Sequence, residues 1–297
     1  MVTIENSSLK IDISEVGAQI QSVIDKKSNY EFIWQGDKKT WPFQAPISFP
    51  FVGSLVNNQY RYKDQVYSMP QDGFVREMPF SLQHQSQHSV SFCLKSSEET
   101  RLQYPFDFSL QVTYTLFEKT ITISFEVLNP SSDQPLYYSL GYLPTFNVST
   151  YSLKNKREFD RVWLDIEPEG HYFRLPLNKE GLVHDRKTHF SDVSKHILDY
   201  KEFRRGPVIH QVSHHTEVIL KDEVQGAGIE FKPSGMYYLG VWASYPKRAD
   251  FIQLQAATGI SDYDYFKGDL TEKEGIIALD CNQLQTHDLT IRFDKSE

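Results

Sequence analysis

An arginine inside an apolar segment is the first side chain in this sequence that suggests chemistry. Residues 69–80, MPQDGFVREMPF, carry an Asp-Gly turn signal and then two apolar residues before Arg76. The planar guanidinium fork can clamp a carboxylate or donate directional, charge-assisted hydrogen bonds to sugar hydroxyls. A local ion pair with Asp72 or Glu77 would satisfy the same charge, and composition alone favours this structural interpretation.

Three histidines, His210, His214 and His215, form the densest group of metal-ligating side chains. A zinc ion would need neutral imidazoles converging at about 2.1 Å, usually with a carboxylate or thiolate to complete the shell. These histidines lie in a polar segment, where we expect them on the solvated surface. His84 and His88, in LQHQSQHSV, are expected in a loop for the same reason. The sequence therefore predicts no metal site.

Composition and motif content exclude several classes of function. The sequence contains no Gly-rich phosphate loop, no G-x-S-x-G elbow and no H-E-x-x-H pair, so we expect no cofactor. Its 31 Lys and Arg against 39 Asp and Glu give a net charge of −8. Because such a chain repels phosphate polymers and anionic lipid surfaces, we expect neither nucleic acid nor a membrane as partner. Oligomeric state does not follow from the sequence.

Cysteine content and the chain start indicate the compartment. Two cysteines in 297 residues, Cys93 and Cys281, fit a reducing environment better than a disulfide scaffold. The first ten residues, MVTIENSSLK, show no charged region followed by an apolar run, so no signal peptide is visible. No stretch reaches the ~18 apolar residues of a membrane helix. We therefore expect a cytoplasmic protein.

The elements that would position these side chains follow a period of two. Across residues 110–127, apolar side chains alternate with Gln, Thr, Ser and Glu on both sides of a polar break at 118–119. This pattern predicts an antiparallel hairpin with one buried face. The same alternation recurs at residues 9–13, 162–166 and 289–293. The last of these predicts a C-terminal strand that completes the same core.

Helix and linker signals are sparse. Residues 191–203 predict one short helix, with Ser191 or Asp192 as N-cap. Without a Gly/Ser-rich or Pro-rich linker, residues 1–297 are expected to form a single all-β domain, an antiparallel sandwich with little helix. The 14% of aromatic residues suits strands, and it also suits a groove in which sugar C–H faces pack on rings. Ordinary core packing accounts for most of these rings.

Four sequence blocks together give a specific resemblance. They are W-x-x-Q-A-P-I-x-F-P-x-x-G-S-L at 41–55, D-G-F-V-R at 72–76, Y-Y-S-L-G-Y-L-P-T-F-N at 137–147 and V-W-A-S-Y-P-K-R-A-D-F-I-Q-L-Q-A-A-T-G at 241–259. In this order and spacing, the chain resembles the aldose 1-epimerase (galactose mutarotase-like) family and, within it, the LacX-type branch. The resemblance implies a β-supersandwich of large antiparallel sheets, with a sugar groove across the concave face of one sheet.

The reaction of that family interconverts the α and β anomers of a hexose. A general acid must protonate the ring oxygen as the C1–O5 bond opens, while a general base takes the proton of the anomeric hydroxyl. In the family a glutamate is the base and a histidine is the acid. A second histidine, an arginine and an aspartate position the sugar.

The resemblance implies that only one of these five positions keeps its family residue, the arginine at Arg76. Asp72 stands where the family's H-G-F-A/V-R has its histidine, and Leu143 stands where G-A-H-P-A-F has the acid. Gln255 stands where I-x-x-E-P-W has the base, and Gly206, in FRRGPVI, aligns with the aspartate. Leucine carries no proton and glutamine does not titrate near neutral pH, so the sequence assigns no catalytic residue.

Three interpretations remain. The preferred one is a sugar-binding protein of carbohydrate metabolism with weak or absent mutarotase activity. Its groove would be lined by Asp72, Arg76, Tyr142, Leu143, Trp242 and Gln255. The alternative is an active hexose 1-epimerase that acts on an unusual sugar and uses Asp72. Burial would raise the pKa of Asp72, whereas a nearby Arg76 would lower it. The third is a scaffold for another protein, against which the family pattern along the whole chain argues.

Overall fold

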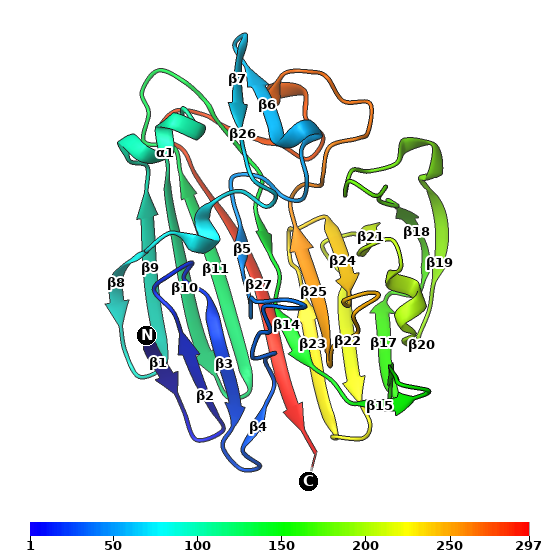
Figure 1. Cartoon of the computed structure of the whole chain (residues 1–297). Coiled ribbons are helices and arrows are strands. Elements are labelled where there is room, and N and C mark those ends of the chain that lie inside the picture. The colour runs from blue at the N-terminus through cyan, green and yellow to red at the C-terminus, as the bar shows by residue number, and fades with distance from the viewer. Residues whose placement is uncertain (297) are drawn as a thin grey trace.

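The computed structural model describes residues 1–296, which fold mainly as antiparallel β-sheets. A nine-stranded sheet forms one layer, in the order β20-β17-β22-β23-β27-β11-β10-β9-β8 (Figure 1). Its strands are β8 (Ser81–Gln85), β9 (Ser89–Lys95), β10 (Ser109–Phe117), β11 (Thr120–Leu128), β17 (Val162–Glu167), β20 (His196–Ile197), β22 (Glu217–Asp222), β23 (Ala227–Lys232) and β27 (Leu284–Lys295).

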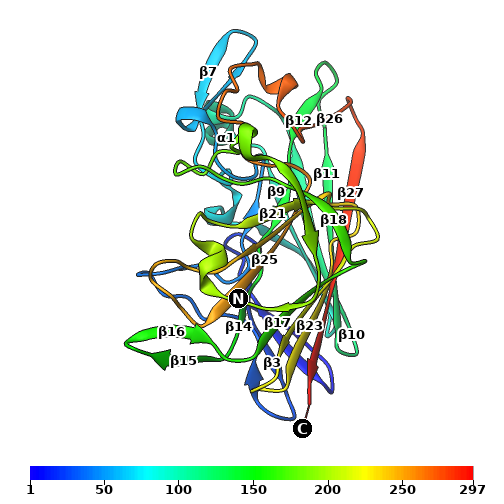
Figure 2. The same cartoon turned by 90° about the vertical axis from the view of Figure 1, so that its right-hand side faces the viewer.

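Two further sheets form the opposing layer (Figures 1 and 2). A four-stranded sheet consists of β1 (Val2–Glu5), β2 (Leu9–Ile13), β3 (Ile20–Asp25) and β4 (Tyr30–Glu31). An eight-stranded sheet has the order β19-β18-β21-β24-β25-β13-β5, with β14 also paired to β25. Its strands are β5 (Ile47–Ser48), β13 (Gly141–Tyr142), β14 (Thr145–Asn147), β18 (Gly170–Arg174), β19 (His189–Val193), β21 (Val208–Gln211), β24 (Tyr238–Trp242) and β25 (Phe251–Ala257).

Small elements connect these sheets. Three two-stranded ribbons are β6 (Gln59–Tyr62) with β7 (Gln65–Ser68), β12 (Leu136–Tyr138) with β26 (Ile277–Leu279), and β15 (Thr150–Leu153) with β16 (Lys156–Phe159). Helical turns are α1 (Glu98–Gln103) and the 3-10 turns η1 (Val56–Asn58), η2 (Val75–Glu77), η3 (Asp185–Lys187), η4 (Tyr200–Phe203) and η5 (Leu270–Glu272). Among residues 1–296, no helix is long and apolar enough to cross a membrane.

The predicted alternation is confirmed. β10 and β11 form the expected hairpin, in which Leu110 lies opposite Val127 and every second side chain is buried. The C-terminal strand β27 lies between β11 and β23 and completes the nine-stranded sheet, as the alternation at residues 289–293 predicts.

Aromatic and hydrogen-bonding contacts join the two layers. The ring of Phe125 in β11 lies 5.8 Å from that of Tyr142 in β13, measured between centroids. The ring centroids of Phe32 and Phe293 lie 5.1 Å apart, and the Tyr114 hydroxyl donates a hydrogen bond of 2.6 Å to the carbonyl of Ala18. The inner face of each sheet is therefore apolar core, which leaves the outer face of the eight-stranded sheet free to form a site.

The helix predicted over residues 191–203 is wrong. The segment begins inside the edge strand β19, continues through β20 and ends in η4, whose N-cap is Asp199. The side chain of Asp199 accepts a hydrogen bond of 2.8 Å from the backbone N–H of Lys201. Pairing of β19 with β18 outweighs the local helix signal, because the edge strand gains a full ladder of backbone hydrogen bonds.

Candidate functional site

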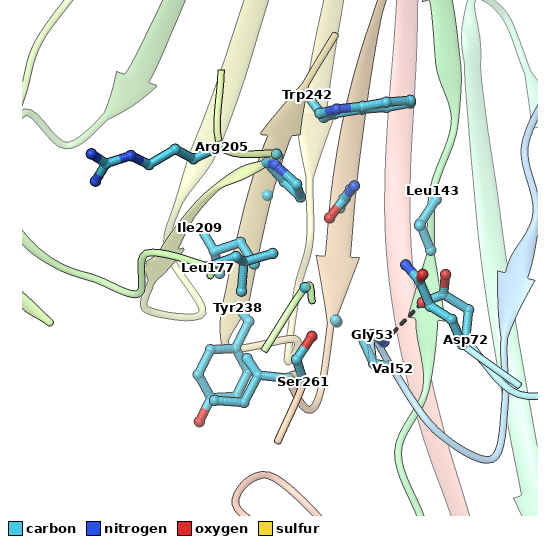
Figure 3. Close-up of a pocket in the computed structure, with 18 of the residues that line it drawn as sticks. Val52, Gly53, Asp72, Leu143, Leu177, Arg205, Ile209, Tyr238, Trp242 and Ser261 are labelled. Carbon is cyan, nitrogen blue, oxygen red and sulfur yellow. Dashed lines mark hydrogen bonds between the residues drawn. The ribbon is translucent and has the colours of Figure 1, made fainter. Parts of the chain in front are cut away.

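A cavity of about 780 Å³ lies on the outer face of the eight-stranded sheet (Figure 3). Strands β24 and β25 form its floor, and segments far apart in the sequence form its walls. Its lining includes Trp41, Val52, Gly53, Asp72, Leu143, Leu177, His184, Lys187, Arg205, Gly206, Ile209, Trp242, Gln253, Gln255 and Ser261. A volume of this size is typical of a small-molecule site, for which the usual range is ~300–1,000 Å³.

Strand alternation decides which floor residues face the cavity. In β25, Ile252 and Leu254 belong to the core, while Gln253 and Gln255 face the cavity. Trp242, in the neighbouring strand β24, also faces the cavity. Successive side chains of a strand point to opposite faces, so one sheet supplies both an apolar core and a polar floor.

Gln255 is held in a short chain of hydrogen bonds. Its Nε2 donates to Oε1 of Gln253 at 2.7 Å, and Nε2 of Gln253 donates to Oγ1 of Thr145 at 3.2 Å. The side-chain oxygen of Gln255 lies over Gly240, where an added Cβ would approach it to 2.4 Å. Glycine at 240 therefore gives the Gln255 amide the room it needs, with Oε1 in a position to accept from a bound hydroxyl.

Asp72 lies in a backbone turn that forms one wall of the cavity. It adopts a φ of 64°, and its Oδ1 accepts a hydrogen bond of 2.8 Å from the N–H of Gly53 (Figure 3). Burial raises the pKa of this carboxyl, and the Gly53 hydrogen bond and the charge of Arg76 only partly offset that effect. Asp72 is thus a buried group that holds its proton more tightly than an ordinary aspartate.

Arg76 lies behind Asp72, outside the cavity lining. Its guanidinium is 3.6 Å from Oδ2 of Asp72 and 4.0 Å from Oε1 of Glu77, the two local ion pairs that the sequence leaves open. The same group lies over the ring of Phe43, at 4.8 Å from the centroid. In this conformation Arg76 contacts Asp72, which lines the cavity, but Arg76 itself does not line the cavity.

The remaining residues predicted for the site divide into two groups. Leu143 and Trp242 line the cavity, and so does Gly206, the position aligned with the family's aspartate. Tyr142 does not: its side chain is fully buried between the layers, against Phe125. Tyr142 and Leu143 are adjacent along the chain, so they point to opposite faces and only one of them can line the groove.

Aromatic rings frame one end of the cavity. Trp242 packs edge-to-face against Trp41, at 5.3 Å between centroids, and tilts against Phe251 at 5.4 Å. Such a half-buried indole presents an apolar surface on which the C–H face of a sugar ring can pack. Its place in the close-up, away from Asp72, leaves space between the two groups (Figure 3).

The structure also places an imidazole in the cavity that the sequence did not single out. Nδ1 of His184 lies 2.8 Å from Oδ2 of Asp264, and both side chains are about a quarter exposed. The two residues are brought together by backbone contacts, since the N–H of Asp264 donates to the carbonyl of Val183 at 3.0 Å. No local pattern in the sequence connects positions eighty residues apart, so only the fold reveals this pair.

A buried ion pair supports the wall beneath Ser261. Nζ of Lys273 donates to Oδ1 of Asp262 at 2.8 Å and to the carbonyl of Ile260 at 2.7 Å. Oδ2 of Asp262 in turn accepts from the N–H of Val56 at 2.9 Å. These bonds join the loop after β25 to the segment around residue 54, and so shape the cavity without entering it.

The histidines considered as metal ligands do not converge. His214 and His215 are exposed, as predicted, whereas the prediction of a solvated surface is wrong for His210. His210 is buried in β21, where desolvation lowers its pKa to about 4. His84 is exposed but lies in strand β8, not in a loop. Among residues 1–296, no group of His, Cys, Asp and Glu is arranged to hold a metal ion.

Comparisons with known proteins agree on one family. The family model described as Aldose 1-epimerase matches residues 1–227. Over 299 aligned residues the chain is 27% identical to the chromosomal LacX protein of Lactococcus lactis subsp. lactis, covering 98% of this chain and 99% of that protein.

Solved structures agree as well. The galactose mutarotase related enzyme of Lactobacillus acidophilus is 30% identical, with a TM-score of 0.93 over 99% of this chain and 97% of that one. A galactose mutarotase-like protein of Lactobacillus casei is 28% identical, with a TM-score of 0.92 over 99% and 100% of the two chains. The resemblance and the all-β fold class predicted from the sequence are confirmed.

Proposed function

Because the chain belongs to the aldose 1-epimerase family, we propose that its main cavity binds a sugar and that the protein has little or no mutarotase activity. One observation carries the proposal. Leu143 and Gln255, which the motif comparison aligns with the family's acid and base, both line the cavity. The site thus keeps the shape for a sugar while these two positions offer no proton transfer.

Sugar binding is supported by polar side chains on the floor and on one wall of the cavity. Gln255 and Gln253 supply amide groups on the floor, and the carboxyl of Asp72 lies on one wall. Trp242 supplies a flat apolar surface. Directed hydrogen bonds combined with a ring for the C–H face are the features that recognise a carbohydrate.

Loss of turnover is supported by the chemistry of the replacements. Anomer exchange needs a group that protonates O5 and another that deprotonates O1, each within hydrogen-bond reach. Each such group typically contributes about 10²–10⁴-fold to the rate. A leucine and a glutamine at these positions remove both contributions, whereas hydrogen bonding to the sugar persists through the amide.

A second candidate function, residual epimerase activity, is favoured by the pair of His184 and Asp264. Asp264 lies close to Nδ1 of His184 without a hydrogen bond between them, and an imidazole that lines the cavity can exchange a proton with a ligand. Asp72, with its raised pKa, would be the second proton-transferring group. This arrangement would replace the family's acid and base from different elements of the same cavity.

The two candidates are separated by measuring binding and turnover on the same protein. Calorimetry against a panel of monosaccharides should detect at least one ligand, and Trp242→Ala should weaken it by roughly tenfold. Lys221→Gln, an exposed position in β22 of the other layer, is the matched control and should bind normally. Absence of binding to every sugar would contradict the proposed function.

Turnover is followed by optical rotation of freshly dissolved α-D-glucose and α-D-galactose. We expect the wild-type protein to leave the spontaneous rate essentially unchanged. An acceleration that His184→Gln or Asp72→Asn abolishes would instead establish the second candidate, with proton transfer by displaced groups.

Location and domain organisation complete the proposal. We propose that the chain acts in the cytoplasm, which its two free cysteines support. We also propose that it is one domain, because one hydrophobic cluster contains residues from Val2 to Phe293.

A further inference from the structure

A second, smaller cavity of about 440 Å³ adjoins the main cavity, which we call the sugar cleft, and it is lined by cationic side chains. The two cavities are adjacent, because both are lined by Leu177, Lys187, Arg205, Gly206 and Pro207. We call the smaller one the basic annex. Its charged lining consists of Arg174, Arg186, Lys187 and Arg205, together with His189 and the single carboxylate Glu202.

The positive charge is concentrated in a chain that is acidic as a whole. Residues 171–210 carry eight Lys and Arg against five Asp and Glu, whereas the net charge of the chain is −8. These cations come from β18, from η3 and from the turn after η4, which are separate in the sequence. Several cations around one hollow give it a positive potential, which attracts an anion.

The acidic residue of the annex is already engaged. Oε2 of Glu202 lies 3.1 Å from Nε2 of His196, and Oε1 accepts a hydrogen bond of 2.7 Å from the N–H of Asp199. Across residues 1–296, no carboxylate lies within ion-pairing distance of Arg174, Arg186, Lys187 or Arg205. Nε of Arg174 is buried and lacks a hydrogen-bond partner in this part of the chain.

We propose that the basic annex binds the phosphate group of a phosphorylated sugar, a hexose 6-phosphate, whose ring occupies the cleft; the inference rests on the proposed function. Arginine forks and a lysine ammonium are the donors that phosphate oxygens match best. Lys187 and Arg205 stand at the junction of the two cavities, where they reach a phosphate attached to a ring in the cleft.

The position of the annex selects the carbon that bears the phosphate. Under the proposed function, the anomeric carbon lies near Leu143 and Gln255. In the close-up, Leu143 and Asp72 lie on one side of the cleft, and the side chain of Arg205 leads away on the other (Figure 3). A phosphate on the exocyclic C6 is separated from C1 by O5, C5 and C6 and can extend away from Leu143 and Gln255, whereas one on C1 would face the buried carboxyl of Asp72.

Calorimetry with five probes tests the inference: D-galactose, D-galactose 6-phosphate, D-galactose 1-phosphate, D-galacturonate and inorganic phosphate. The 6-phosphate should bind at least about tenfold more tightly than each of the others. Arg205→Gln and Lys187→Gln should each weaken the 6-phosphate by roughly 10- to 100-fold, because each removes a charge-assisted hydrogen bond. Arg174→Gln and Arg186→Gln, which change residues that line only the annex, should also weaken the 6-phosphate but should not alter binding of the free sugar by more than about twofold.

Controls separate this inference from the proposed function. Lys221→Gln and Arg61→Gln remove exposed charges elsewhere and should leave the affinity for the 6-phosphate unchanged. Added salt should weaken the 6-phosphate but not the free sugar, because only the former depends on charge. Equal affinity for galactose and its 6-phosphate would overturn the annex while leaving the cleft proposal intact, and no binding of any sugar would overturn both. Tighter binding of galacturonate, of the 1-phosphate or of inorganic phosphate alone would also overturn it.

Discussion

Introducing two proton-transferring groups, at the positions where the family resemblance implies an acid and a base, is the perturbation that probes the cleft most sharply. In the double variant Leu143→His with Gln255→Glu, the new imidazole would protonate the ring oxygen and the new carboxylate would take the anomeric proton. Because each group is worth about 10²–10⁴-fold, we expect mutarotation at least about 100-fold faster than with the wild-type protein. Each single change should give less, since both proton transfers are needed.

The structure indicates how the cleft would tolerate these changes. Gln255→Glu removes the donor that now lies 2.7 Å from Oε1 of Gln253 and places two acceptors together. Gln253 can turn its amide so that Nε2 donates to the new carboxylate, and the hydroxyl of Thr145, now an acceptor at 3.2 Å, can donate to its oxygen. The network therefore reverses direction without losing a bond, and the fold should survive.

The assay is optical rotation of α-D-galactose and of its 6-phosphate, with calorimetry on the same samples. Leu143→Asn with Gln255→Ala is the matched control, because it changes both positions and introduces no titrating group. Normal sugar binding without any acceleration in the double variant would refute the placement of the anomeric carbon between these two residues.

The remaining predictions concern the supports of the site and the stability of the fold. Gly240→Ala should leave the protein folded but weaken sugar binding by roughly tenfold, because the added Cβ would lie 2.4 Å from Oε1 of Gln255; calorimetry and circular dichroism check it, and unchanged affinity would count against Gln255 as a ligand. Lys273→Met should lower the free energy of unfolding by about 3 kcal/mol, since it leaves the buried carboxylate of Asp262 without its partner; urea unfolding measures this loss, and a neutral result would show that the pair does not support the wall. Burial lowers the pKa of His287 to about 4, so its folded form binds fewer protons than the unfolded chain between about pH 6.5 and 4. The contribution of neutral His287 to the free energy of unfolding is complete above that window and declines by about 1.4 kcal/mol per pH unit as the pH falls through it. In urea unfolding, His287→Gln should therefore lose less stability than the wild type between pH 7.5 and 5. Parallel losses in the two proteins would show that His287 does not cause this pH dependence.

Much of the fold follows from the sequence because the alternation of apolar side chains is regular. The hairpin of β10 and β11 and the closing strand β27 bury alternate residues as their patterns predict. The segment at 191–203 shows the limit of local signals. Its residues offer an N-cap at Ser191 or Asp192, yet pairing at the edge of a sheet determines the structure of its first part.

The site is only partly predictable for a similar reason. Asp72, Leu143, Trp242 and Gln255 share one cavity, whereas Tyr142 belongs to the core, and choosing between adjacent residues requires knowing which face of a short strand is buried. The ion pair between Asp72 and Arg76 follows from their spacing.

His184 and the basic annex depend on long-range contacts. Asp264 lies eighty residues beyond His184, and the annex joins β18 to the turn after η4. Local sequence patterns do not report such juxtapositions.

Exchange NMR on the wild-type protein with D-galactose and D-galactose 6-phosphate tests the central claim most directly, because one sample reports both binding and anomer exchange. Selective inversion of the α-anomeric proton measures the rate of conversion to the β form, and saturation transfer from the protein to the ring protons measures contact. We predict clear saturation transfer with an exchange rate equal to that in buffer. An exchange rate far above that in buffer, or no transfer to either sugar, would contradict it.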